Sequence, residues 1–161
     1  MKKKLPWLGV MRLDYMYLDV GCVLLAAAAA IYTHGRINLF YLLLAFVGGI
    51  SAHIGVNALN EYLDFRSGLD FTTNRTPFSG GTGTLPDRPD LAPVALGIAV
   101  SGLSITVLVG LYFWLVRGWP IVPLGLLGLL LILTYTTWIT RLPALTLINT
   151  GTGFGLLMVT G

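Results

Sequence analysis

Four polar side chains recur at helical spacing within an apolar stretch of this sequence. They are His53, Asn57, Asn60 and Asp64, separated by four, three and four residues. At about 3.6 residues per turn these positions share one face of a helix. Polar and ionisable groups at membrane depth are costly, so they usually face a protein interior or a wet cavity and mark function. The spacing therefore predicts a polar face on one helix, with Glu61 at its flank.

The same run supplies a helix end and a further carboxylate. Gly68 is expected to end the helix, because glycine readily adopts the left-handed conformation found at many helix C-termini. Asp70 can then fold back toward the polar face. The side-chain oxygens of Asn60, Asp64 and Asp70 are hard ligands that suit magnesium better than zinc or copper. Magnesium commonly combines one or two carboxylates with phosphate oxygens and water, so these three are the candidate catalytic and metal-holding residues for a metal–diphosphate ligand.

A structural interpretation of the polar face stands beside the functional one. Membrane-buried His and Asn side chains often form hydrogen bonds between helices. For His53 alone we favour this interpretation. For Asn60, Asp64 and Asp70 together we favour the functional one, since three ligand-type residues at one helix end exceed what capping requires.

The composition is that of a membrane protein. Only 17 of 161 residues are charged and 55% are hydrophobic, against roughly 25% charged residues in soluble domains. This composition excludes an autonomous soluble domain and a disordered tail. The net charge is +3, but apart from Lys2–Lys4 the basic residues are scattered, which argues against nucleic-acid binding. Cys22 is the only cysteine, which excludes a disulfide framework and a thiolate metal cluster.

The apolar stretches predict an all-α, polytopic helical bundle in the lipid bilayer. A span needs about 20 mostly apolar residues, and five stretches meet or approach this length: 15–32, 39–59, 91–116, 121–139 and 142–161. The first has a basic flank but leads at once to another span, so we interpret it as an anchor rather than a cleaved signal. Residues 1–161 are expected to form one transmembrane domain, with a single long loop at about 65–90.

The distribution of Lys and Arg predicts the orientation. With the N-terminus in the cytoplasm, eight of the ten basic residues lie inside: Lys2, Lys3, Lys4, Arg12, Arg66, Arg75, Arg88 and Arg141. Arg36 and Arg117 fall outside. The long loop is then cytoplasmic. Because the positive-inside rule already accounts for Arg12, we do not expect it to be a catalytic group. Asp14 and Asp19 are expected at or near the interface.

The polar run resembles a known family motif. Asn57-x-x-Asn60-x-x-x-Asp64-x-x-x-Gly68-x-Asp70 is similar to the first aspartate-rich motif of the UbiA superfamily of intramembrane prenyltransferases. It looks most like the menaquinone-type branch, in which a polyprenyl chain is joined to dihydroxynaphthoate. Other branches have aspartates where this sequence has Glu61 and Gly68. Two later segments also resemble the family: 74–81, which contains Arg75, and 135–155, which contains Tyr135, Arg141 and a glycine-rich end.

The resemblance implies a nine-helix bundle of which this chain supplies about five helices. It implies transfer of an isoprenyl group from a polyprenyl diphosphate to an aromatic or quinone-precursor acceptor, with Mg²⁺ as cofactor, in a bacterial or archaeal cell membrane. Arginines can contact phosphate oxygens in bidentate fashion. The expected substrate-binding residues are Asn57, Arg66, Arg75, Tyr135 and Arg141.

One expected part of such an enzyme is missing from the sequence. The family carries a second aspartate-rich motif, yet no acidic residue follows Asp90. We therefore expect the chain to be the N-terminal half of a longer protein, inactive without its C-terminal half. The alternative is a non-enzymatic membrane protein, such as a fragment of an ion-coupled transporter with the polar face as its ion path. A transporter should repeat its polar site in a second, symmetry-related segment, and none is found in the sequence.

Overall fold

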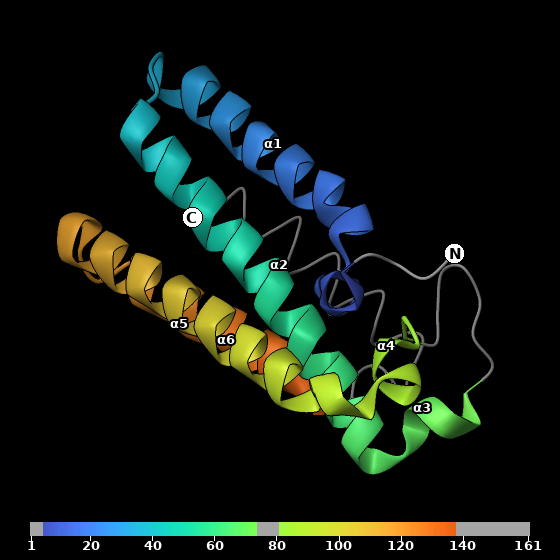
Figure 1. Ribbon diagram of the computed structural model, residues 1–161. Helices are drawn as coiled ribbons and strands as arrows, with labels where there is room; N and C mark the ends of the chain where they lie inside the picture. The colour runs from blue at the N-terminus through green and yellow to red at the C-terminus, as the bar shows by residue number, and fades with distance from the viewer. Residues whose placement is uncertain (1–4, 74–80, 138–161) are drawn as a thin grey trace.

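The structure is a computed structural model that describes residues 5–73 and 81–137, and the side chains of all of these except 135–137. Within those two ranges every regular element is a helix, which confirms the all-α expectation. The longer helices are α1 (Met16–His34), α2 (Leu39–Ser67), α5 (Ala92–Arg117) and α6 (Ile121–Thr137). Figure 1 shows α2 lying between α1 and α5, with α6 on the far side of α5 from the viewer.

Three helical stretches are long and apolar enough to cross a membrane: Pro6–His34, Leu39–Ser67 and Pro89–Arg117. They contain the first three spans expected from the sequence. The fourth expected span corresponds to α6, whose apolar part, Ile121–Thr134, is shorter. The fifth, at 142–161, lies outside the described residues.

Local signals set the ends of α2. The side chain of Asn38 accepts a hydrogen bond from the Tyr41 amide at 3.2 Å, which satisfies one of the free N–H groups at the helix start. Gly68 closes the helix in the left-handed conformation, with φ of 79°. The helix end predicted at Gly68 is thus confirmed. The helix continues past the predicted end of its apolar span, so its last two turns carry Asn60 and Asp64.

The helices α2 and α5 cross in direct backbone contact. A Cβ atom added at Gly102 would lie 2.7 Å from the carbonyl oxygen of Ser51 and 2.9 Å from the Cα of Gly55. The Thr106 hydroxyl donates to the Gly48 carbonyl at 3.3 Å. Small residues allow this approach, as at many helix contacts in membranes. The contact fixes α5 against the apolar half of α2.

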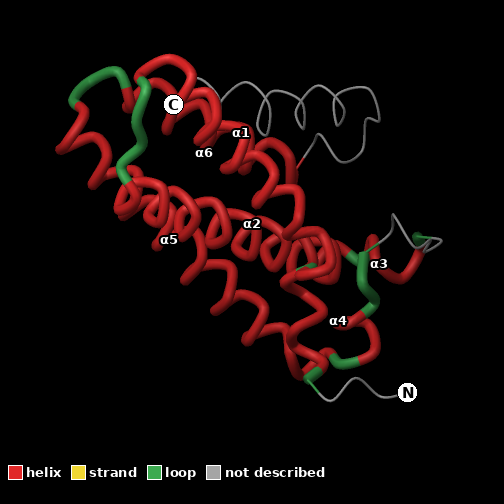
Figure 2. The backbone as a smooth tube through the Cα atoms, turned by 90° about the horizontal axis from the view of Figure 1, so that it is seen from above, coloured by secondary structure: helices red, strands yellow, loops and turns green. Residues whose placement is uncertain are grey.

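The segment expected as a long loop at 65–90 is largely helical where it is described. It contains the end of α2, α3 (Leu69–Thr72), α4 (Thr84–Asp87) and the start of the 3₁₀ turn η3 (Pro89–Leu91). Figure 2 shows α3 and α4 together beside one end of α2. Two further 3₁₀ turns, η1 (Pro6–Met11) and η2 (Leu13–Tyr15), precede α1.

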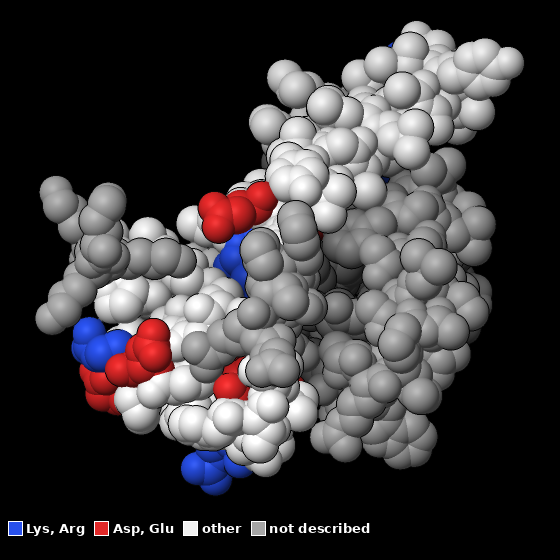
Figure 3. Space-filling view, turned by 90° about the vertical axis from the view of Figure 1, so that its right-hand side faces the viewer, with Lys and Arg blue, Asp and Glu red and all other residues white. Residues whose placement is uncertain are grey.

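The hydrophobic core gathers near the polar end of α2. It joins residues of η1, α2, α4 and α5: Val10, Ala58, Leu85, Ala95 and Ala99. On the face shown in Figure 3 the charged side chains lie over the lower and left-hand part. The projecting upper part carries few charged side chains, and it lies at the height of the α1–α2 turn in Figure 1. The core therefore packs the N-terminal turns and α4 against the part of α2 that bears the motif.

Candidate functional site

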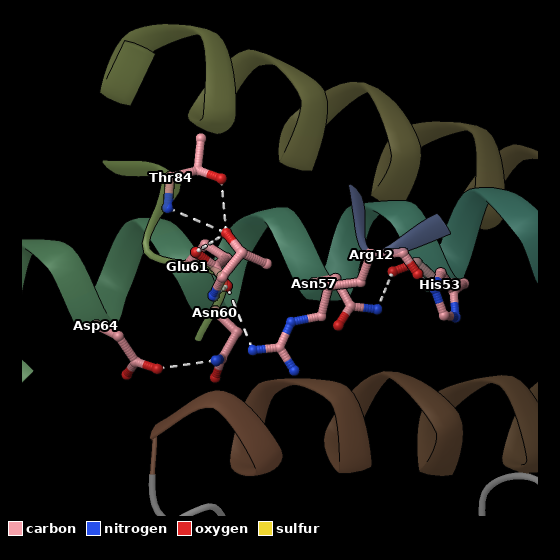
Figure 4. Close-up of polar contacts among 8 residues, drawn as sticks. Arg12, His53, Asn57, Asn60, Glu61, Asp64 and Thr84 are labelled. Carbon is pink, nitrogen blue, oxygen red and sulfur yellow. Dashed lines mark hydrogen bonds and ion pairs between the residues drawn. The ribbon is translucent and has the colours of Figure 1, made fainter. Parts of the chain in front are cut away.

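The polar face predicted on one helix lies on α2. Figure 4 shows His53, Asn57, Asn60 and Asp64 in succession along the helix. The Asn60 Nδ2 donates to Asp64 Oδ2 at 2.9 Å, and the Asn57 Nδ2 donates to the His53 carbonyl at 2.8 Å. The i to i+4 spacing thus brings Asn60 and Asp64 into contact, as the sequence predicts.

The side-chain oxygen of Asn60 lacks a partner in this pair. Its Oδ1 is buried and has no hydrogen-bond partner among the residues that the structure describes. A buried amide oxygen without a donor costs about 1–3 kcal/mol. Because the amide nitrogen is held by Asp64, the Oδ1 atom is turned away from that carboxylate. An acceptor in this state suits a cation or a donor group from a ligand.

Asp70 folds back toward α2, as expected, and meets Glu61. It follows Gly68 on α3 and is only 4% exposed. A Cβ atom added at Gly81 would lie 2.8 Å from Asp70 Oδ1 and 3.4 Å from Glu61 Oε1. Both carboxylates therefore approach the Gly81 backbone, which has φ of 73°. Only glycine fits this combination of left-handed backbone and close contact without strain.

The contacts do not bring the three candidate metal residues together as expected. Asn60 contacts Asp64, whereas Asp70 and Glu61 share the space beside Gly81. In the described ranges, no three His, Cys, Asp or Glu side chains come together in a group that could hold a metal ion. A magnesium ion bound here would thus rely on amide oxygen, phosphate and water besides one or two carboxylates, which is its common mode of binding.

Glu61 is the buried centre of a polar cluster that the sequence did not predict. Its side chain is fully buried and lies 3.3 Å from the Arg12 Nη2 atom. It also accepts hydrogen bonds from the Thr82 amide at 2.7 Å and from the Thr82 hydroxyl at 3.0 Å. The Thr82 hydroxyl in turn contacts the Thr84 hydroxyl at 2.7 Å. Arg12, which we expected only to mark the cytoplasmic side, therefore lies within the candidate site (Figure 4).

His53 forms the contacts between helices that we favoured for it. Its Nδ1 atom lies 2.7 Å from the Asp19 carboxylate of α1, and its Nε2 atom lies 3.2 Å from the Arg12 carbonyl oxygen. Asp19 is only 4% exposed and His53 only 8%. The pair therefore joins α1, α2 and the N-terminal turns.

The remaining candidate residues are less engaged or are not described. Arg66 is exposed on the last turn of α2. Arg75 and Arg141 lie outside the described residues, and Tyr135 lies on α6 with its side chain not described. At the rim, Arg88 and Asp90 form an exposed ion pair at 2.6 Å. The Asp90 carboxylate raises the pKa of the Arg88 guanidinium through that hydrogen bond and its charge.

Comparisons with protein-family models, with curated proteins and with solved structures find no match to this chain. The chemistry of the site therefore carries the functional argument. One end of a membrane-length helix brings together carboxylates, an arginine and a buried amide oxygen that lacks a donor. Such a set can bind a metal-bound anion.

Proposed function

We propose that this chain binds an isoprenyl diphosphate together with Mg²⁺ and belongs to a prenyltransferase of the UbiA type. As part of that enzyme's nine-helix fold, it would serve in transfer of the isoprenyl group to an aromatic or quinone-precursor acceptor. The polar end of α2 would face the cytoplasm, in keeping with the distribution of Lys and Arg. The motif from Asn57 to Asp70 supports this proposal through its resemblance to the family.

The observation that carries the proposal is the state of Asn60. Its Oδ1 atom is buried without a hydrogen-bond partner among the described residues, and its Nδ2 atom is fixed on Asp64. An amide oxygen beside a carboxylate is the hard donor set that magnesium takes, so these residues fit the ion. In this proposal Asn60 and Asp64, at the end of α2, hold one side of the ion. Asp70 follows Gly68 in the sequence, on α3.

Each residue then has a distinct part in the chemistry. Bound magnesium would supply Lewis-acid stabilisation of the departing diphosphate. Asn60, Asp64 and Asp70 orient the diphosphate end, while Arg12 and the exposed Arg66 supply donors for phosphate oxygens. Glu61 holds the Arg12 guanidinium and the Thr82 amide in place.

An apolar groove between α2 and α5 supports an isoprenyl ligand. The groove has a volume of about 480 Å³, lies between α2 and α5, and includes Met11 in its lining. Met11 directly precedes Arg12, whose guanidinium contacts Glu61. Apolar walls accommodate a hydrocarbon chain and keep water away from a reactive carbocation.

The test is direct binding of radiolabelled geranylgeranyl diphosphate to the purified chain in lipid nanodiscs. We expect binding that requires Mg²⁺, is abolished by EDTA, and weakens about tenfold or more in Asp64→Ala and Asn60→Ala. Asp87→Ala is the matched control, because Asp87 is an exposed acid on α4. Binding that is absent, independent of magnesium, or equally weakened by Asp87→Ala would refute the proposal. Magnesium- or proton-driven uptake into vesicles without diphosphate binding would favour the transporter.

A further inference from the structure

His53 bridges two segments that are distant in the sequence. Its ring contacts the Asp19 carboxylate through Nδ1 and the Arg12 carbonyl oxygen through Nε2. Both neighbours are acceptors, so a ring that carries hydrogen on both nitrogens donates to both. The Asp19 and His53 side chains are 5% and 6% exposed, respectively. The contact between His53 and Asp19 therefore lies in the protein interior.

The residue that His53 holds has an unusual backbone conformation. Arg12 has φ of 46° and ψ of 48°, and in the described ranges it is the only residue other than glycine with positive φ. That conformation is unfavourable for a residue with a Cβ atom, so surrounding contacts must hold it. The Arg12 carbonyl accepts hydrogen bonds from the Tyr15 amide at 3.0 Å and from His53. The turn between η1 and η2 is thus fixed from α2.

The side chain of the same residue enters the candidate site. Arg12 Nη2 lies 3.3 Å from Glu61 Oε1, two helical turns along α2 from His53. Figure 4 shows the Arg12 side chain extending along α2 from its contact with His53 past Asn57 toward Glu61. Backbone and side chain of Arg12 are therefore anchored to one helix at two points.

We propose that His53, oriented by Asp19, is a positioning residue that sets the Arg12 guanidinium at the anion-binding end of the site. His53 acts through the Arg12 carbonyl and does not itself contact the ligand. This inference rests on the proposed function in one respect only: it takes the site to bind an anion. The placement of the Arg12 turn by His53 does not depend on which anion that is.

Two substitutions separate the contacts of His53. His53→Gln places an amide nitrogen near the position of Nε2 and keeps a donor for the Arg12 carbonyl. His53→Asn places its nitrogen near Nδ1, which keeps a donor for Asp19 and loses the contact with Arg12. A role confined to packing or to the link with Asp19 predicts no advantage for Gln over Asn. A positioning role predicts rescue by Gln only.

The first readout is magnesium-dependent binding of geranylgeranyl diphosphate. We expect His53→Gln to bind within about threefold of the wild type, and His53→Asn to lose about tenfold, as Arg12→Ala does. In the Arg12→Ala background, His53→Asn should cost nothing further, because its effect passes through Arg12. Additive losses, or equal losses for Gln and Asn, would overturn the inference. His34→Asn is the control, since His34 is exposed and contacts only its neighbour Thr33 among the described residues.

The second readout needs no ligand. Hydrogen–deuterium exchange in the segment 6–15 should be faster in His53→Asn and unchanged in His53→Gln. If the wild-type chain fails to bind the diphosphate, the proposed function fails, and this exchange experiment still decides whether His53 fixes the Arg12 turn. Equal exchange in the two variants would overturn that placement. Circular dichroism and size-exclusion chromatography identify any variant that has not folded.

Discussion

The guanidinium of Arg12 and the carboxylate of Glu61 form a partly buried ion pair at 3.3 Å, although their positions lie 49 apart in the sequence. The Glu61 side chain is fully buried, while that of Arg12 is 23% exposed. Thr82 supplies two further hydrogen bonds to the same carboxylate. Glu61 therefore connects the N-terminal turns, α2 and the start of the α4 segment.

Neutralising Glu61 should destabilise the protein. Glu61→Gln leaves the Arg12 charge without its partner and weakens the acceptor of the Thr82 amide, so we expect a loss of about 1–3 kcal/mol in the free energy of unfolding. Denaturation in mixed micelles, followed by circular dichroism, measures it. Asp90→Asn removes the exposed pair with Arg88 and should leave the unfolding curve unchanged. If both variants unfold alike, the Arg12–Glu61 pair contributes no more to the free energy of unfolding than the exposed Arg88–Asp90 pair does.

A methyl group at Gly81 should disrupt the contact with the two carboxylates. Gly81→Ala imposes a left-handed backbone on alanine and places its Cβ 2.8 Å from Asp70 Oδ1. Gly35→Ala is a matched control, because Gly35 has φ of 71° and nothing within 4 Å of an added Cβ. The control should cost about 1–2 kcal/mol from backbone strain alone, and Gly81→Ala clearly more. Equal losses in unfolding free energy would show that the carboxylates move aside at no cost.

Sequence patterns predicted the helices and the polar face but not what covers that face. The first three apolar spans, the spacing from His53 to Asp64 and the break at Gly68 are local features, and the described residues contain each of them. The partners of Glu61 come from positions 12 and 82, and no periodicity within α2 specifies them. A signal was present nonetheless. Glu61 adjoins Asn60 in an apolar run and needed a partner, and Arg12 is a basic residue that flanks an apolar span.

The crossing of α2 and α5 should tolerate no added methyl group. In Gly102→Ala the new Cβ would lie 2.7 Å from the Ser51 carbonyl oxygen, a backbone atom, so the helices must separate. We expect a loss of about 1–3 kcal/mol in mixed-micelle unfolding. Gly110→Ala lies on the same helix with nothing within 4 Å of its added Cβ. It should be neutral or stabilise by up to about 1 kcal/mol, through helix propensity. If Gly110→Ala is also destabilising, the loss of stability in Gly102→Ala arises from alanine in this helix and not from the contact between the two helices.

A second carboxylate at position 60 should make stability depend on magnesium. Asn60→Asp replaces the donor that contacts Asp64 Oδ2 at 2.9 Å with another acceptor. Two carboxylates so close repel one another, and a divalent cation between them offsets the repulsion. We expect a lower melting temperature in EDTA and a rise on addition of Mg²⁺ larger than that of the wild type. Asn57→Asp, one turn away on the same face, is the control for added charge. An equal magnesium response in both variants would contradict a cation site at Asn60 and Asp64.

The length of α2 has a consequence for how a ligand arrives. Its 29 residues extend roughly 44 Å at about 1.5 Å per residue, whereas the hydrocarbon core of a bilayer is about 30 Å thick. An upright helix that enters the core at Leu39 leaves it near Ala58, which places Asn60 and Asp64 among the lipid headgroups. The phosphates of the surrounding lipids lie at the same depth. The isoprenyl diphosphate that we propose as ligand, dissolved in that leaflet, would therefore reach the site by lateral diffusion. Occupancy of the site would follow the mole fraction of the ligand in the membrane and not its concentration in water.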